Sequence, residues 1–250
     1  MKIVLFISVL LFTLSSNSQI INTEAFRKAT DTTGWIGTVS LNLSLSKNTK
    51  SKFSIKNKIH IQYKTKKSIF LFVNDIGFER IDNEDFINKG VQHLRYNYKF
   101  NQRISSEFFL QNQYNALYKI DFRELAGAGI RVKLTKSEKY KMYFGVLLMY
   151  EYEKTKSDYI LYHKDWRNSN YLSFSFYFNK NIALISTTYF QPLINQLADY
   201  RIAHQSALKF KIAKNLAYKM SVNYTYDRYP VLGIPQEEYH ISNGIVYSFK

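Results

Sequence analysis

The 250-residue sequence has no cysteine, and it has only 3 prolines and 9 glycines. The absence of cysteine excludes a disulfide framework, a thiolate metal site, a thiol nucleophile and a lipoprotein anchor. The low glycine and proline counts exclude collagen-like and linker sequences, and an apolar content of 46% excludes a disordered chain. Acidic residues are also few, because 19 Asp and Glu stand against 35 Lys and Arg, which gives a formal net charge of +16.

What the sequence has in excess is aromatic side chains, with 21 Tyr and 19 Phe. The mean hydropathy is nevertheless negative, at −0.30. A soluble protein with an apolar core seldom needs so many rings in an otherwise polar chain. We therefore expect many of these rings to face lipid.

The one long hydrophobic run lies at the N-terminus, from Ile3 to Leu14. A basic residue precedes it and small polar residues follow it, which predicts a secretory signal peptide over residues 1–18, cleaved after Ser18. The run is too short to span a bilayer, because a membrane helix needs about 20 apolar residues. Residues 19–33 are then expected to form a short periplasmic segment, and residues 34–250 the folded domain.

Almost the whole remaining chain alternates between apolar and polar residues. Val39 and Leu41, for example, alternate with Ser40 and Asn42. The same period of two recurs along the chain and predicts twelve strands, most of them ten to fourteen residues long. One predicted strand, at residues 69–78, is apolar on both faces.

Strand length and strand number together indicate a membrane barrel. Strands of globular proteins are usually about 5–6 residues long, whereas a tilted membrane strand needs about 9–11. About eight strands enclose an interior that side chains just fill, so twelve strands with an apolar interior would leave it unfilled and wet. The apolar face should therefore point outward into lipid, and the polar face should line the lumen. The expected fold class is an all-β, antiparallel up-and-down transmembrane barrel.

The predicted connections alternate in length, as they do in outer-membrane barrels with short periplasmic turns and long external loops. Short polar connections follow the even-numbered strands, for example at residues 101–103 and 179–181. Longer external loops are expected at Glu79 to Gly90, Glu153 to Asp165 and Tyr229 to Glu238. Closing the sheet would pair every backbone group in the lipid layer.

Several segments resemble the family called domain of unknown function 481. They are QHLRYNYKFN (Gln92 to Asn101), FLQNQYNALYKIDFRELAGAGIRVKL (Phe109 to Leu134), TTYFQPL (Thr187 to Leu193), ADYRI (Ala198 to Ile202) and NGIVYSF (Asn243 to Phe249). The resemblance covers roughly Ile20 to Phe249 and implies an outer-membrane β-barrel of a Gram-negative bacterium, of the Bacteroidetes type. It implies no catalytic residues, and it adds the hint of a salt- or stress-induced role.

The segment from Tyr239 to Gly244 resembles the His and Ser signature of the outer-membrane phospholipase A barrels. His240 and Ser242 share one face of a strand, as a base and its nucleophile must. That enzyme carries its pair on the lipid side, whereas the alternation here turns His240 and Ser242 toward the lumen. Polar lumen lining is therefore the favoured interpretation, and lipid hydrolysis by this pair is the alternative.

Basic residues dominate the face that is predicted to line the lumen. The set comprises Lys56, Lys58, His60, Arg95, Lys99, Arg131, Lys133, Arg201, Lys209, Lys211 and Lys219. Such a set would attract anions into a pore, because low-dielectric walls focus the field of like charges. The other interpretation, which we favour, is that these cations mark the periplasmic rim and pair with lipid phosphate or with the few lumen acids.

These features predict an integral outer-membrane protein of the cell envelope without evident enzymatic activity, acting as a narrow pore or as a structural barrel. A closed barrel whose external loops bind a surface partner is a further alternative. The expected partners are outer-membrane lipids, lipopolysaccharide and, through Phe249, the barrel-assembly machinery. We expect a monomer without metal or cofactor, and no nucleic-acid binding despite a pI of about 9.7, because the protein is exported.

Overall fold

The computed structural model of the protein describes residues 33–82, 84–135, 137, 139–156, 159–213 and 216–247. The predicted signal peptide, nearly all of the segment at 19–33 and the C-terminal Phe249 lie outside these residues. Among the described residues, no helix is long and apolar enough to cross a membrane.

The described chain forms twelve strands and one short 3-10 helix. In order, these are β1 (Gly34–Lys47), β2 (Ser51–Lys64), β3 (Ser68–Ile81), β4 (Glu84–Lys99), β5 (Ile104–Asn115), η2 (Ala116–Tyr118), β6 (Ile120–Lys133), β7 (Tyr140–Lys156), β8 (Ile160–Tyr177), β9 (Ile182–Pro192), β10 (Tyr200–Lys211), β11 (Leu216–Asp227) and β12 (Glu237–Tyr247). Each strand pairs with the next along the chain, so the order in the sheet is the order in the sequence. The predicted set of twelve antiparallel up-and-down strands is confirmed.

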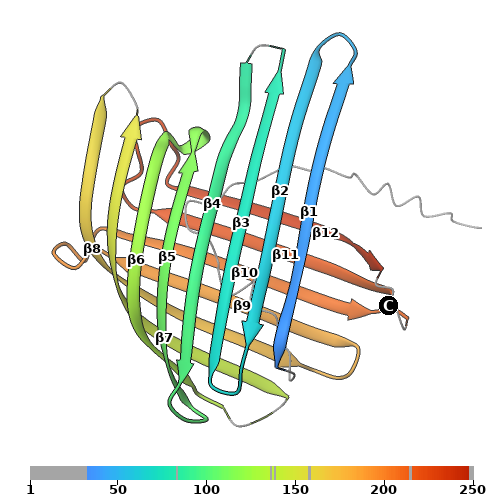
Figure 1. The fold of residues 1–250 in the computed structure, drawn as a ribbon, viewed down its shortest axis with the longest axis vertical. Coiled ribbons are helices and arrows are strands. Elements are labelled where there is room, and N and C mark those ends of the chain that lie inside the picture. Colours follow the sequence, from blue (N-terminus) through green and yellow to red (C-terminus); the bar gives the residue numbers. More distant parts are fainter. Residues whose placement is uncertain are drawn as a thin grey trace, which may run out of the picture.

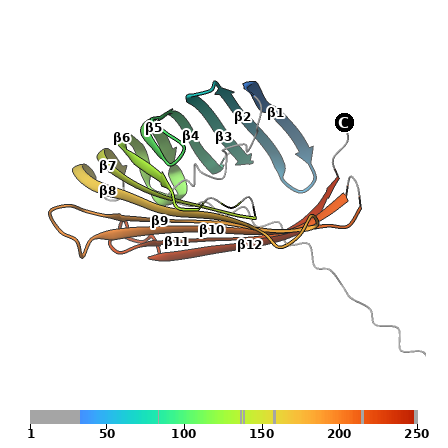
Figure 2. The same cartoon turned by 90° about the horizontal axis from the view of Figure 1, so that it is seen from below.

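The sheet is strongly curled. β1 to β5 lie over β9 to β12, and β6 to β8 form the bend between these two layers (Figure 1, Figure 2). β1 and β12 are the two ends of the hydrogen-bonded order, and within the described residues no ladder joins them.

The period of two sorts side chains onto two faces. We call the side enclosed by the curled sheet the inner face, and Glu107, Glu151 and Arg201 lie buried on it. Their strand neighbours Phe108 and Ile202 point to the opposite side, which we call the outer face. The structure therefore places most charged residues of the strands inside and most exposed apolar residues outside, as the alternation predicts. It also buries an apolar cluster on the inner face, which the alternation did not predict.

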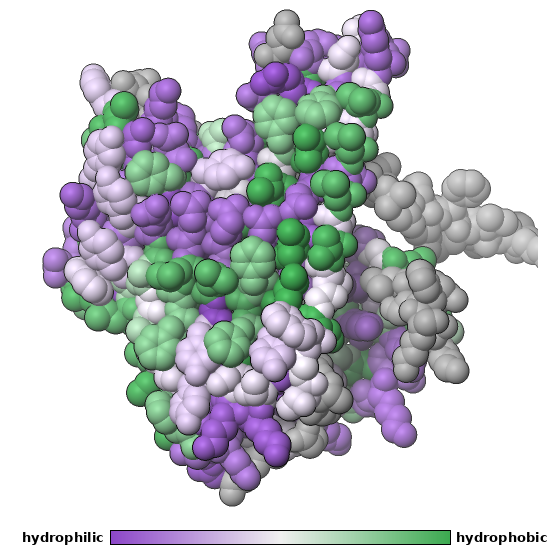
Figure 3. All heavy atoms as spheres, in the orientation of Figure 1, coloured by the Kyte–Doolittle hydropathy of each residue, from purple (hydrophilic) through white to green (hydrophobic). Residues whose placement is uncertain are grey.

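Aromatic side chains form a row across the outer face of β1 to β5. Trp35, Tyr63, Phe70, Tyr96 and Phe108 follow one another, with neighbouring ring centroids 4.7 to 6.5 Å apart. Apolar side chains gather over these strands, and a hydrophilic band crosses them (Figure 3). Rows of rings on an apolar face are typical of the girdles that flank the lipid-facing band of a barrel.

The separation of the girdles is visible on β7. Tyr140 lies beside Phe176 near one end of the strand, with ring centroids 6.1 Å apart, and Tyr150 lies beside Trp166 nearer the other end, at 5.1 Å. The ten residue steps from Tyr140 to Tyr150 extend about 33 Å along a strand. A strand tilt of about 40° reduces this distance to about 25 Å along the barrel axis, the height of the apolar band in outer-membrane barrels.

The long loop predicted at Glu79 to Gly90 is wrong, because the two strands continue through it. β3 and β4 are joined by residues 82 and 83 alone. Asp82 adopts a left-handed conformation with φ of 53°, and its carboxylate accepts a hydrogen bond of 2.8 Å from the Ser51 backbone N–H. An ion pair of 2.5 Å between Arg80 and Asp85 connects the strand ends. The charged residues here belong to the ends of the two strands. Charged residues are equally compatible with a solvated loop, so the sequence alone does not distinguish the two.

The loop predicted at Glu153 to Asp165 is wrong for the same reason. β7 ends at Lys156 and β8 begins at Ile160, and Lys154 forms an ion pair of 2.5 Å with Asp121 of β6. The third predicted loop is confirmed in substance, because residues 228–236 form a long connection between β11 and β12.

Two inner-face glycines make room for aromatic rings between the layers. A Cβ atom on Gly127 would lie 2.3 Å from the Phe109 ring, and one on Gly145 would lie 2.1 Å from the Tyr171 ring. Both rings belong to a buried apolar cluster that also contains Met149. The absence of side chains at these glycines therefore permits the two layers to pack against each other.

Candidate functional site

The predicted basic residues all lie on the inner face, but in three different environments. Arg95, Arg131 and Arg201 are buried. His60 and Lys133 are half-buried. The remaining six are exposed: Lys56, Lys58, Lys99, Lys209, Lys211 and Lys219.

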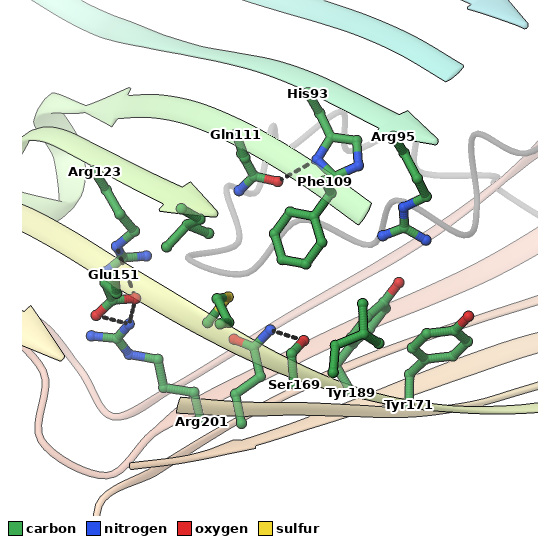
Figure 4. Close-up of a pocket in the computed structure, with 14 residues that line it drawn as sticks. His93, Arg95, Phe109, Gln111, Arg123, Glu151, Ser169, Tyr171, Tyr189 and Arg201 are labelled. Carbon is green, nitrogen blue, oxygen red and sulfur yellow. Dashed lines mark hydrogen bonds and ion pairs between the residues drawn. The ribbon is translucent and has the colours of Figure 1, made fainter. Parts of the chain in front are cut away.

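Glu151 on β7 is the centre of the buried part. It is 1% exposed, and both of its carboxylate oxygens accept hydrogen bonds from Arg201 Nη1, at 2.9 and 2.8 Å. Arg167 Nε lies 3.6 Å from Oε1 and Arg123 Nε lies 3.8 Å from Oε2. One carboxylate from β7 thus faces three guanidinium groups, from β8, β10 and β6. Figure 4 shows two of them, those of Arg123 and Arg201.

Each of these three arginines also contacts a second carboxylate. Arg123 donates to Glu153, and Arg167 Nη1 donates to Asp199 at 3.0 Å. Arg201 Nε donates to Asp227 on β11 at 2.9 Å. These contacts extend one network of charge across β6, β7, β8, β10 and β11, and each arginine has more than one acidic neighbour.

A second buried carboxylate, Glu107 on β5, lies between β4, β6 and β8. It is fully buried; Arg131 Nη1 is 3.6 Å from Oε1 and Arg95 Nη1 is 3.9 Å from Oε2. Asn97 Nδ2 donates to Oε1 and the Tyr171 hydroxyl donates to Oε2, both at 2.6 Å. Buried charges are tolerated when they are paired and hydrogen-bonded, and Glu107 meets both conditions.

The two charged clusters enclose a small cavity. Its lining includes Phe109, Met149, Tyr171 and Tyr189, and Gln111 is bonded to His93 at 2.9 Å (Figure 4). The cavity volume is about 30 Å³, which accommodates about one water molecule. The inner faces of β4 to β10 are therefore packed against one another. We call this region the packed wall; it consists of Glu107 and Glu151, the arginines around each of them, and the aromatic rings that line the cavity.

Arg123 and Arg167, which complete the charged network, were not among the predicted lumen residues. Arg123 shares the inner-face parity of Arg131 on β6, so the alternation already contained its signal. Arg167 lies two residues after the wrongly predicted loop at Glu153 to Asp165. Extending the period of two through that loop would have placed it inside.

His240 and Ser242 lie on the inner face of β12, as the alternation predicts, and both are half-buried. The Ser242 hydroxyl lies 2.8 Å from the Ser221 hydroxyl, and His240 is opposite Asn223 in the ladder. Within the part of the chain that the structure describes, no hydrogen bond joins His240 to Ser242. The same part of the chain contains no group of three or more His, Asp or Glu placed to hold a metal ion.

A family model for proteins of unknown function matches residues 30–249. The chain belongs to the DUF481 family. This DUF481 protein has no match among the curated proteins compared with it.

Some solved structures resemble the DUF481 chain. The NanC porin is 8% identical with a TM-score of 0.49, over 84% of this chain and 100% of that one. The CymD monoaromatic hydrocarbon channel is 9% identical with a TM-score of 0.47, over 86% and 79%. The KdgM porin is 14% identical with a TM-score of 0.40, over 80% and 97%. These identities are too low to carry a ligand or a solute from those proteins to the DUF481 chain.

Proposed function

We propose that this protein is an integral β-barrel of a bacterial outer membrane, exported through a cleaved signal peptide, whose lumen is a narrow passage that favours anions. The division of charge on the inner face carries this proposal. Glu107, Glu151, Glu153 and Asp227 each lie within 3.9 Å of an arginine, so most of the lumen acid is neutralised inside the packed wall. Exposed lysines then contribute most of the remaining charge on the inner face.

The outer face supports a membrane location. Large apolar side chains are exposed in the middle of the strands, such as Leu41 at 71%, Leu110 at 60% and Leu148 at 46%. Single exposed apolar residues are ordinary on soluble proteins, but a broad, largely apolar face bounded by aromatic rows is a lipid or protein contact surface. The spacing of about 25 Å between the rows matches lipid.

Closure of the sheet belongs to this proposal. An edge strand in lipid would leave a row of backbone N–H and C=O groups without partners, each at a cost of several kcal/mol. β1 and β12 run antiparallel in an up-and-down sheet of twelve strands, so they are able to pair. We propose that this pairing forms in the membrane.

The passage lies beside the packed wall, along the inner faces of β2, β10 and β11. Lys56 and Lys58 on β2 and Lys219 on β11 are exposed there. Like charges on low-dielectric walls raise the local concentration of anions. Since the packed wall occupies much of the lumen, we expect small conductance steps.

Charge reversal at Lys56 and Lys58 tests the proposal. In planar bilayers with a salt gradient, the native protein should give small steps with a reversal potential on the anion side. The double variant Lys56→Glu/Lys58→Glu should move that potential to the cation side. The matched control Lys66→Glu/Lys67→Glu changes the same charge in the exposed turn between β2 and β3 and should leave the sign of selectivity unchanged. Cation selectivity of the native protein would contradict the proposal, and complete absence of steps would favour a closed structural barrel.

A further inference from the structure

A hydrogen-bonded cluster of polar side chains lies on the outer face of β9 and β10. Its members are Ser186 and Thr188 on β9, and His204 and Ser206 on β10. In the ladder, His204 is directly opposite Thr188 and Ser206 is directly opposite Ser186. We call these four residues the outer polar cluster.

The cluster places the Ser206 hydroxyl within hydrogen-bond distance of an imidazole nitrogen. Ser206 Oγ lies 2.8 Å from His204 Nε2, and Thr188 Oγ1 lies 2.8 Å from His204 Nδ1. Ser206 Oγ donates a hydrogen bond to Ser186 Oγ at 2.9 Å. When Nδ1 donates to Thr188, Nε2 is left as an acceptor for the Ser206 proton, because a neutral imidazole has one donor and one acceptor nitrogen. The Ser206 hydroxyl, which donates to Ser186 in the structure, must turn toward Nε2 to transfer its proton to His204.

The surroundings of the cluster are apolar. Tyr200 and Phe210 mark the aromatic rows at the two ends of β10, with partners 5.6 and 6.4 Å away. Ser206 is six residues from Tyr200 and four from Phe210, or about 15 Å and 10 Å along the axis of a barrel whose strands tilt by about 40°. The cluster therefore lies well inside the lipid-facing band. An ionisable residue at membrane depth is costly and marks a functional site by default.

A second polar set on the outer face provides a comparison, because its side chains are hydrogen-bonded to one another but carry no catalytic groups. Asn57, Asn74 and Gln92 on β2 to β4 form a chain of amide contacts of 2.7 and 3.1 Å. That chain contains neither a nucleophile nor a base. The outer polar cluster contains both, in the order hydroxyl, imidazole, hydroxyl.

We propose that Ser206 and His204 form a catalytic pair that cleaves acyl esters dissolved in the lipid layer, with Thr188 as a positioning residue for the imidazole. The inference rests on the proposed membrane location. Ser206 Oγ attacks the ester carbonyl carbon while His204 Nε2 takes its proton, and His204 then returns the proton to the departing alcohol as the ester C–O bond breaks. Water hydrolyses the acyl-Ser206 ester in a second step, which releases the fatty acid and restores the hydroxyl.

The depth of the cluster selects the substrate class. Charged headgroups stay at the membrane surface, whereas neutral acyl esters enter the hydrocarbon layer. We therefore expect long-chain neutral esters to be cleaved in preference to phospholipids. Water is scarce at this depth, so the acyl-Ser206 species should accumulate during turnover.

The experiment uses the refolded full chain in phosphatidylcholine vesicles and in detergent micelles. The probes are a long-chain nitrophenyl ester, a diacylglycerol and an alkyl fluorophosphonate, which labels activated serines covalently. We expect ester cleavage with an acyl adduct on Ser206, and a loss of about 100-fold or more in Ser206→Ala and His204→Gln. Thr188→Val should lower kcat about tenfold at unchanged KM, and Thr188→Ser should restore it, a rescue that a merely structural role would not produce.

The chain supplies its own matched control, because β12 carries a second His-x-Ser sequence on the inner face. The variant His240→Gln/Ser242→Ala should retain full ester cleavage and full fluorophosphonate labelling. Absence of labelling and cleavage in protein that floats with vesicles would overturn the catalytic inference and leave the membrane proposal intact. Failure to float would overturn the membrane proposal, while labelling in micelles would still decide whether Ser206 is activated. Cleavage that survives Ser206→Ala would also overturn the inference.

Discussion

Replacing Glu151 with glutamine is expected to lower the free energy of unfolding by about 3–5 kcal/mol. Glutamine keeps the shape of the side chain but removes the charge that faces Arg123, Arg167 and Arg201. The three guanidinium groups would remain buried with one carboxylate fewer, and an uncompensated buried charge is strongly destabilising. Denaturant titration of the protein folded into vesicles measures the loss.

The matched control for this prediction is Glu84→Gln. Glu84 is an exposed carboxylate at the start of β4, and its replacement should change the free energy of unfolding by no more than about 0.5 kcal/mol. A loss below about 1 kcal/mol in Glu151→Gln would show that charge does not hold the packed wall together.

Lysine introduced on the outer face is expected to destabilise the protein far more than lysine introduced next to it on the inner face. Val222 and Asn223 are neighbours on β11, and Val222 lies midway between the outer-face rings of Tyr218 and Tyr226. Val222→Lys places a charge near the bilayer midplane and should cost about 2–4 kcal/mol. Asn223→Lys faces the lumen and should cost less than about 1 kcal/mol.

Comparing the stabilities of Val222→Lys and Asn223→Lys shows whether the outer face contacts lipid or water. Val222 is 37% exposed, so in a soluble protein its replacement by lysine would be close to neutral. Equal stability of the two variants in vesicles would therefore contradict the assignment of the outer face to lipid. The same denaturant titration measures both.

The alternation of residues predicted the strands because lipid on one side and a polar lumen on the other enforce it. Leu94 and Tyr96 against Arg95 and Asn97, for instance, already specify which side of β4 is buried. The strand ends were harder to predict, because beyond the apolar band both faces are polar, as at Arg80. Polarity alone then does not separate a ladder from a loop.

Side-chain contacts between strands could not be predicted from the sequence, because they depend on which residues pair across neighbouring strands. His204 and Ser206 interrupt the apolar outer positions of β10, and Ser186 and Thr188 interrupt those of β9, so the breaks in the pattern were visible. Their meeting was not, since a shift of one residue would turn one set to the other face. The same holds for Glu151 and its arginines, which come from four different strands.

The fluorescence of the two native tryptophans tests the membrane assignment most directly. The chain contains 2 Trp, and both lie on the outer face, Trp35 at 75% exposure near one end of β1 and Trp166 at 49% on β8. Each belongs to one of the aromatic rows. In vesicles, lipids brominated close to the headgroup should quench both emissions more strongly than lipids brominated at the chain ends, and iodide in the water should quench them weakly. Strong quenching by iodide with no effect of brominated lipid would show that the outer face contacts water and would contradict the membrane barrel.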